Sequence, residues 1–491
     1  MNFLFYALLI GLAIIAYLAF STSHRKMQAL SMVHALSYLA PAAYLLLYVD
    51  LPVYYLGNRY LFIDHLCLYE VLIATTVFFF AAMYSWGYVE GLVRAGELNR
   101  RDINVFYLMF NALLIVTVLS FMSNNLALFW IFAELTTVAS ALLVAILNSK
   151  KNIDAALEYI LITSTLMLFS FIGLMFLFEL SKQASTAGTL NWDELMAIAK
   201  SLPPTPLVFS FIFVFIGFAS KAGIAPFHTW LPHAHSKAPS AVSAILSGVV
   251  LNIGLYGILR AYAIVRQTGA EQTISYFLIA FGVLTVFVAA FTMLHQKNLK
   301  KIMAFSSVEN MGLMLAGIGI GTHAAVFWVL YHKLAHSLTK ALLFFSAGVL
   351  HRQYLSNRAD RMQYVFRLQP LAALGLIIGA AAISGMPPFP MFISKISILI
   401  QALSFSVPLL LALLLLVLMA SASLVVFLIR LFSNKDEGRA HMERYDTQPG
   451  MEAPIIALII ILFAIGIFFP DGLRSMLDTI TTELGFIGAK P

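Results

Sequence analysis

The chain has 491 residues, of which 61% are hydrophobic and 11% are charged, and its mean hydropathy is +0.89. These values exclude a water-soluble globular protein and place the chain among integral membrane proteins. The single cysteine, Cys67, excludes a disulfide framework and any iron–sulfur cluster ligated by this chain alone. The sequence also has no glycine-rich phosphate-binding motif, so a redox reaction or ATP hydrolysis that drives this protein must take place on another subunit.

Long apolar runs recur along the whole chain, and each can cross a hydrocarbon core of roughly 30 Å as a helix. We therefore expect an all-α polytopic fold with about fourteen membrane-spanning helices in one membrane domain, residues 1–491. The expected spans are residues 2–20, 29–49, 67–88, 104–122, 124–147, 155–181, 205–225, 240–265, 273–293, 302–321, 324–350, 369–404 with a break, 407–433 and 453–470. The first run lacks a charged region before it and a cleavage site after it, which predicts a retained helix rather than a signal peptide.

The net charge of +7 has an uneven distribution. Lysines and arginines gather in alternate connections, for example at Arg25, at Lys150 and Lys151, and at Lys301. The positive-inside rule places these connections in the cytoplasm and both termini outside. Membrane topology thus accounts for the charge, and no nucleic-acid partner is expected. The longest connections, residues 182–204 and 434–452, are predicted to be solvated loops, with a short surface helix at 191–201.

Two sets of five predicted helices, residues 104–266 and 270–433, show a weak internal symmetry. The fourth helix of each set carries a lysine beside a Gly/Pro break: Lys221 in "SKAGIAP" and Lys395 in "SGMPPFPMFISK". Because five is an odd number, such repeats must be inverted in the membrane. Proline frees backbone groups that need water or polar partners. We therefore expect two inverted repeats whose interrupted helices line a wet cavity near the membrane midplane.

Charged residues inside the predicted spans are the first candidates for function. A carboxylate in mid-span, such as Glu134, costs about 2.5–3.5 kcal/mol to insert and needs a partner or water. Burial disfavours the charged form of Lys221, whereas a nearby carboxylate favours it. If these two effects balance, Lys221 can take up and release a proton, and Glu134 is the obvious carboxylate. The alternatives are a structural ion pair for Glu134 and snorkelling to the interface for Lys221. His228 and His235, with His233, follow on the inward side and could feed protons to Lys221, or serve as polar turn residues.

Three ionisable residues, Lys333, His336 and Lys340, fall at i, i+3 and i+7 in one span. Helical geometry stacks them on one face, which is typical of a hydrated proton relay. His332 and His336 also form an i, i+4 pair that could bind zinc, but the sequence offers no obvious third ligand, and we expect no metal.

Lys395 follows the second Gly/Pro break and mirrors Lys221 in the proposed symmetry. It is interpreted either as a gate for protons to one side of the membrane or as an anchor at the membrane interface. The basic loop at Lys297, Lys300 and Lys301 is interpreted as a topology signal with N-cap chemistry. Glu309, an acid one turn into a hydrophobic helix, remains open.

The motifs "FAELTTVAS", "SKAGIAPFHTWLPHAHSKAPSAVSAILSG", "SSVENMGLMLAGIG" and "HSLTKALLFFSAGVLH" resemble those of the antiporter-like proton-pumping subunits of respiratory complex I, Mrp-type cation/proton antiporters and energy-converting hydrogenases. The likeness covers most of the chain and is closest to the hydrogenase-four component F type. It implies ion-pair roles for Glu134 and Lys221, a central relay at Lys340 or His336, and a terminal group at Lys395.

Three positions depart from the family pattern. Asn252 stands where complex I and Mrp members commonly have a lysine, so proton passage there would depend on water. Lys395 stands where an acid is often expected, and Glu158 where many relatives carry a lysine or another residue.

The resemblance implies a proton-translocating, non-redox subunit of a group 4 hydrogenase, formate hydrogenlyase-like or related complex in a prokaryotic inner membrane. Its partners would be other membrane subunits and a peripheral redox arm, such as a NiFe hydrogenase or other iron–sulfur electron-transfer subunits. Protons, or sodium ions, would be transported, and the chain would hold no cofactor. A Mrp-type sodium/proton antiporter subunit is the alternative, and a static scaffold is the third interpretation.

Overall fold

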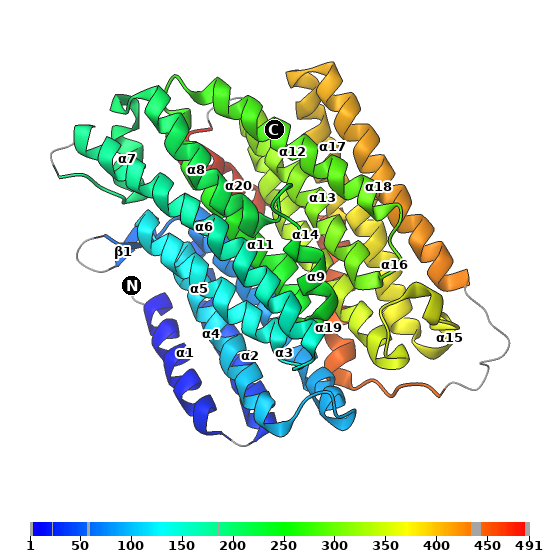
Figure 1. Cartoon of the computed structure of the whole chain (residues 1–491). Coiled ribbons are helices and arrows are strands. Elements are labelled where there is room, and N and C mark those ends of the chain that lie inside the picture. The colour runs from blue at the N-terminus through cyan, green and yellow to red at the C-terminus, as the bar shows by residue number, and fades with distance from the viewer. Residues whose placement is uncertain (1–2, 22, 56–58, 185–186, 434–442, 487–491) are drawn as a thin grey trace.

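The computed structural model describes residues 3–21, 23–55, 59–184, 187–433 and 443–486. It is a bundle of helices, with α1 on one flank, α18 on the other and α14 between them (Figure 1). The helices are α1 (Phe3–Phe20), α2 (His24–Tyr48), α3 (His65–Arg94), α4 (Arg100–Met122), α5 (Leu126–Ala145), α6 (Lys150–Ala184), α7 (Trp192–Ile198), α8 (Pro204–Ala222), α9 (Trp230–Lys237), α10 (Ser240–Ile245), α11 (Leu251–Arg266), α12 (Glu271–Met293), α13 (Leu299–Ile320), α14 (His323–Tyr354), α15 (Val365–Leu368), α16 (Pro370–Ser384), α17 (Pro390–Phe405), α18 (Val407–Ser433), α19 (Pro449–Ile467) and α20 (Asp471–Glu483).

The predicted multi-span helical fold is confirmed. Within the described residues, eleven helices are long and apolar enough to cross a membrane, and three shorter helices are also apolar. The expected number of about fourteen spans and the orientation of the termini stay predictions. Beside the helices there is one small antiparallel hairpin of β1 (Val53–Tyr55) and β2 (Leu61–Ile63), which the sequence patterns did not indicate.

Both predicted helix interruptions are present. Helix α8 ends at Ala222, and Gly223 follows with φ of 71°, a left-handed conformation that glycine adopts without strain. Helix α16 ends in the same way at Ser384, with Gly385 at φ of 79°. The chain then resumes as α9 and α17, respectively. The relation of these two breaks by an inverted repeat remains a prediction.

A π-helical segment, Leu246–Val250, separates α10 from α11. The backbone comes so close to α14 here that a Cβ atom on Gly248 would lie 3.0 Å from the carbonyl oxygen of Ser337. Such π-segments are frequent at functional sites. In this protein the segment brings the polar groups around Ser247 and Gly248 against the centre of α14.

Helix α14 forms the core of the bundle. It is 32 residues long and is buried along most of its length. It packs against α3, α10, α13, α16, α17 and α19, which together cover it on all sides. His332, Lys333, His336 and Lys340 in its middle are therefore shielded both from lipid and from bulk water.

The connections are compact. The surface helix predicted at 191–201 is present as α7 followed by a 3₁₀ turn, Ala199–Ser201. Residues 185–186 and 434–442 of the two long connections lie outside the described part of the chain. Helix α20, Asp471–Glu483, follows the last apolar helix and was not predicted.

Close helix packing at one glycine gives a prediction for stability. A Cβ atom on Gly282 of α12 would lie 2.7 Å from the backbone nitrogen of Ala316 and 2.8 Å from the carbonyl oxygen of Gly312, both in α13. We expect Gly282→Val to force these helices apart and to lower the free energy of unfolding by about 1–3 kcal/mol, the usual range when extra methylene groups are forced into a packed core. A lowered thermal midpoint of the purified protein checks this. Gly472→Ala is the control, because a Cβ atom added there would meet no described atom within 4 Å, and an equal effect of both substitutions would contradict the prediction.

Candidate proton-transfer site

Lys221 lies in the last turn of α8 and is completely buried. Its ammonium donates a hydrogen bond of 2.7 Å to the Thr137 hydroxyl of α5. Snorkelling to the membrane surface is therefore wrong for this residue, since the head group, like the stem, is enclosed by protein. A buried lysine held by a hydroxyl is suited to exchange a proton, because a hydroxyl can accept from the charged amine or donate to the neutral one.

Glu134 lies on α5 one turn before Thr137 and is half-buried. Its Oε1 accepts a hydrogen bond from Ser164 of α6, whereas its Oε2 is buried and has no hydrogen-bond partner among the described residues. Lys221 lies within electrostatic range of this carboxylate. The two predicted partners thus belong to one site, and Thr137 rather than the carboxylate receives the hydrogen bond of the ammonium.

The three histidines after the first break do not act as one cluster. His235 is fully buried, stacks on the Phe344 ring with centroids 4.9 Å apart, and is hydrogen-bonded at neither ring nitrogen within the described residues. Its charged neighbours are Lys340 and Lys300. His235 thus lies against α14, and the expectation that it feeds protons to Lys221 stays a prediction. His228 is half-buried near Phe305, at 6.3 Å between ring centroids.

His233 lies at the surface on the predicted inner side. It pairs with Glu158 of α6 at 2.7 Å, and both line an open cavity of about 710 Å³. Lys237 lines the same cavity, where burial, and then the charges of Lys151 and Lys301, lower its pKa. The structure thus places Glu158 in a pair with His233 at the rim of this open cavity, and its role stays open.

Lys300, assigned to a basic loop from the sequence, lies in the first turn of α13 and is buried. Its ammonium donates a hydrogen bond of 2.9 Å to the carbonyl oxygen of Ala238. The N-cap of α13 is Asn298, whose side chain accepts from the backbone N–H of Lys301 at 3.1 Å, so the helix begins before Ser306 and Glu309, where the sequence had placed its start. The loop therefore combines a helix cap with an inward-pointing cation.

Asn252 of α11 connects the two halves of the protein. Its amide nitrogen donates to the Ser337 hydroxyl of α14 and to the Gly248 carbonyl, both at 3.0 Å. Its Oδ1 is buried and has no hydrogen-bond partner among the described residues. Nearby, the hydroxyls of Ser247 and Ser307 are 2.7 Å apart and join the π-segment to α13. These groups can pass a proton along hydrogen bonds but cannot store one at neutral pH.

The ionisable residues of α14 do not share one set of neighbours. Lys340 is fully buried and donates to the carbonyl oxygen of Met303 at 2.7 Å and to the Ser306 hydroxyl, both in α13. Lys333 instead pairs with Glu70 of α3. The two lysines thus contact different neighbouring helices, and their common relay role stays a prediction.

His336 lies between these two lysines in the sequence of α14. It is fully buried, and neither ring nitrogen is hydrogen-bonded within the described residues. Lys340 and Lys395 lie within electrostatic range of its ring. An imidazole without fixed partners can turn or bind a water molecule, which suits the predicted relay role.

Lys395 lies in the second turn of α17 and forms a buried ion pair of 3.1 Å with Glu309 of α13. Glu309 also acts electrostatically on Lys340, so the three residues form one charged group. This position makes a simple interfacial anchor wrong for Lys395. The acid left open in the sequence is its partner.

His332 bridges the same region. One ring nitrogen is 2.8 Å from the Ser394 hydroxyl and the other is 2.9 Å from Oδ1 of Asn310. Both nitrogens of this potential zinc ligand are therefore already engaged. No group of three metal-ligating side chains is found in the part of the chain that the structure describes.

Two buried pairs were missed by the sequence analysis. Glu70 of α3 pairs with Lys333, and Asp64, at the start of α3, forms a two-fold ion pair with Arg260 at 2.6 and 2.7 Å. Glu70 lies within the expected span 67–88, and an acid in a span is itself a signal for function. Its partner could not be found from the sequence, since 263 positions separate Glu70 from Lys333.

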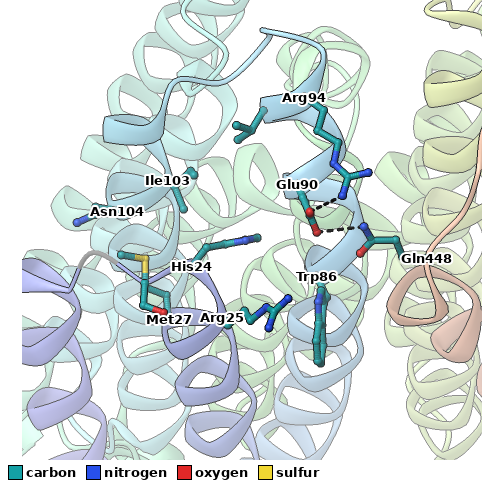
Figure 2. Close-up of a pocket in the computed structure, with 11 residues that line it drawn as sticks. His24, Arg25, Met27, Trp86, Glu90, Arg94, Ile103, Asn104 and Gln448 are labelled. Carbon is teal, nitrogen blue, oxygen red and sulfur yellow. Dashed lines mark hydrogen bonds and ion pairs between the residues drawn. The ribbon is translucent and has the colours of Figure 1, made fainter.

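Another cavity, of about 670 Å³, lies at the ends of α2, α3 and α4. Figure 2 shows Glu90 in it between Arg94, at 2.6 Å, and Gln448, at 3.0 Å. None of the predicted proton-transfer residues is among its described lining residues. This cavity is therefore separate from the buried row that runs from Lys221 to Lys395.

Comparisons with known proteins identify the family of the chain. Residues 123–421, more than half of the chain, match the family model described as NADH:quinone oxidoreductase/Mrp antiporter, transmembrane. A hydrogenase-4 component F homolog from Methylacidiphilum infernorum is 29% identical over 419 residues, which are 84% of this chain and 86% of that protein.

Two solved structures share the fold. A chain of the membrane-bound sulfane sulfur reductase, an archaeal respiratory membrane complex, has a TM-score of 0.85 at 22% identity and covers 97% of this chain and 96% of its own length. A chain of the Mrp complex from Dietzia sp. DQ12-45-1b has a TM-score of 0.82 at 18% identity, with coverage of 98% and 96%. The chain therefore belongs to the NADH:quinone oxidoreductase/Mrp antiporter transmembrane family.

Proposed function

We propose that the chain is a proton-translocating, non-redox subunit of a hydrogenase-like or related respiratory complex in a prokaryotic cytoplasmic membrane. The observation that carries this proposal is the buried row of ionisable and hydroxyl groups through the bundle. Its buried members are Lys221 on Thr137, Asn252 on Ser337, Lys340 on Ser306, and Lys395 paired with Glu309, and the half-buried Glu134 lies within electrostatic range of Lys221. Ionisable groups inside a membrane protein typically mark ion pathways.

The proposed first step takes place at Lys221. When the charge of Glu134 is neutralised or moves away, the buried ammonium loses its electrostatic support and releases a proton. The neutral amine keeps the Thr137 hydroxyl as a hydrogen-bond donor. When the carboxylate returns, Lys221 takes up a proton from the inner side and the cycle restarts.

The middle of the path crosses from α11 to α13 and α14. Asn252 and the serines of this region align hydrogen bonds without holding a charge, so water molecules must complete the connection. Lys340 is the next group that can hold a proton. From Lys340 the proton moves toward Lys395, whose charge is balanced by Glu309.

The proposal includes partners. The similarity to a hydrogenase-4 component supports assembly with other membrane subunits and with a peripheral arm that carries the iron–sulfur and hydrogenase or other electron-transfer centres. Redox chemistry in that arm would set the charge state next to Glu134. The described helices leave apolar side chains of α5 and α6 exposed, for example Leu135 and Leu161, as expected for faces that meet lipid or neighbouring subunits.

A substitution at Glu134 tests this function. In sealed vesicles that contain the intact complex, we expect Glu134→Gln to lower redox-driven proton uptake roughly tenfold or more, which corresponds to about 1.4 kcal/mol or more in the barrier. The isosteric amide cannot change its charge. A pH-sensitive dye reports the uptake, and the rate of electron transfer is measured in parallel.

The matched control is Glu179→Gln, because Glu179 lies on an exposed turn of α6 with 62% of its side chain accessible. This control should pump at the wild-type rate. If Glu134→Gln also pumps at that rate, the carboxylate has no part in transport and the static-scaffold interpretation is favoured.

A Mrp-type sodium/proton antiporter subunit is the second candidate, because the chain has the fold of a Mrp complex subunit over almost its whole length. The two functions differ in their driving force. An antiporter would exchange sodium for protons across vesicles that receive no electron donor, whereas the proposed pump would stay idle until the donor is added. Sodium-driven proton movement without a donor would overturn the main proposal.

A further inference from the structure

We propose that Glu70 and Lys333 form a proton-holding pair through which the proposed pump releases protons on the predicted outer side. This inference rests on the proposed function and adds a residue, Glu70 of α3, that lies outside both sets of five helices. The pair connects α3 to the central helix α14. It is distinct from the pairs at Lys221 and Lys395.

Burial argues against a purely structural role. Both side chains are at most 2% exposed, and Oε2 of Glu70 is buried and without a hydrogen-bond partner among the described residues. The free-energy cost of removing two charges from water is about as large as the attraction between them in the buried pair. Two apolar residues would therefore hold the helices together at least as well. An acid with one oxygen left free has room for a proton or a water molecule at that oxygen.

Lys333 is connected to the buried row. Its backbone carbonyl accepts a hydrogen bond of 2.9 Å from the Ser337 hydroxyl, the same hydroxyl that receives the amide of Asn252 at 3.0 Å. His336 follows Lys333 by three residues and thus lies on the adjacent turn. This contact reaches only the backbone of Lys333. The amine is placed beside the buried row by its position on α14, four residues before Ser337 and seven before Lys340, and its own hydrogen bond goes to Glu70.

Glu70 is also close to the surface. His65, five residues earlier in α3, has 23% of its side chain exposed and pairs with Glu483 at 2.6 Å. Five residues of helix span only about 8 Å. Directly before His65, Asp64 pairs with Arg260, whose guanidinium lies 4.3 and 5.0 Å from the ring centroids of Trp192 and Phe62. Ionisable side chains therefore stand at the end of α3 that is predicted to face outward.

The proton balance of the step is simple. In the resting pair, Lys333 is charged and Glu70 is ionised. A proton moves from the ammonium of Lys333 to the carboxylate of Glu70, which leaves a neutral amine and a neutral acid. Glu70 then loses this proton to water on the outer side, and Lys333 takes up a new proton from the buried row, which restores the pair.

Substitutions in the intact complex, measured in sealed vesicles, test the inference. We expect Glu70→Gln to lower redox-driven pumping roughly tenfold or more, while Glu70→Asp retains part of it because a carboxylate remains. Ser85→Ala is the control on the same helix, since its hydroxyl bonds only to the backbone of α3. It should pump normally, and normal pumping by Glu70→Gln would overturn the inference.

A double substitution separates transport from folding. Glu70→Gln with Lys333→Met removes both charges, so no unpaired buried charge is left and assembly should match the wild type. We expect this protein to assemble without pumping. Normal pumping by the double variant would show that the pair is only structural. Glu134→Gln is measured beside it. If Glu134→Gln pumps normally, the proposed function itself is contradicted. If Glu134→Gln loses pumping but the Glu70 variants pump normally, only the proposed release through Glu70 and Lys333 is contradicted.

Discussion

Replacing Lys221 by alanine is expected to abolish coupled proton pumping while the complex still assembles. The ammonium is completely buried and donates a hydrogen bond to the Thr137 hydroxyl. After the substitution, another hydroxyl or a water molecule can take over as the hydrogen-bond partner of Thr137. Loss of the amine removes the group that stores the proton on the first half of the path. We expect pumping to fall roughly tenfold or more, as for loss of a positioned proton-transfer group. Dye quenching in vesicles measures the rate.

Lys221→Arg makes this test specific for proton release. Arginine keeps the positive charge but does not give up its proton in proteins. If Lys221 only balances Glu134 as a fixed charge, the arginine variant should pump; if it must release a proton, the variant should fail like alanine. Lys200→Ala, at an exposed position after α7, is the control and should leave pumping unchanged. A normal rate in Lys221→Arg would contradict the proposed role.

Lys340→Met is expected to interrupt the path between the two halves with an effect of similar size. Lys340 is the storage group held by Ser306 and the Met303 carbonyl, and it is coupled to Glu309. Methionine fills a similar volume without a titratable group, so the cavity left behind is small. We expect the rate of proton pumping to fall roughly tenfold or more. Electron transfer should then either continue without proton pumping or slow down together with it. Simultaneous recording of the dye signal and of donor oxidation distinguishes these results.

The control for Lys340 is Lys297→Met, which removes one positive charge from an exposed position of the α12–α13 connection. Assembly is compared by the yield of purified complex. A Lys340→Met protein that assembles and pumps like this control would show that protons bypass α14 altogether.

The sequence alone predicted the helical membrane fold and both helix interruptions, because these depend on local properties. Apolar length predicts a span, and the Gly/Pro clusters after Lys221 and before Lys395 predict breaks wherever they stand. The hairpin of β1 and β2 was not predicted, because two strands of three residues leave too short an alternating pattern. The π-segment at Leu246–Val250 likewise has no periodic signature that separates it from an ordinary helix.

Several candidate residues and the Glu134–Lys221 partnership could be proposed from the sequence, but the other contacts could not. Glu134, Lys221 and Lys395 stood out because charges inside apolar runs are rare. Their partners come from helices far apart in the sequence, as with Lys395 and Glu309, and only tertiary packing decides which side chains meet. The spacing of Lys333 and Lys340 places both on one face of α14, but it does not predict their partners. Lys333 contacts α3, whereas Lys340 contacts α13.

The number of protons moved per electron is the measurement that tests the central claim most directly. It should be determined on the intact complex in proteoliposomes, first with the wild-type chain and then with Lys221, Lys340 and Lys395 all replaced by methionine. If the buried row carries protons, the ratio falls by the whole contribution of this subunit while the complex remains assembled. An unchanged ratio in the assembled triple variant would contradict the account, because protons would then cross the membrane without these side chains.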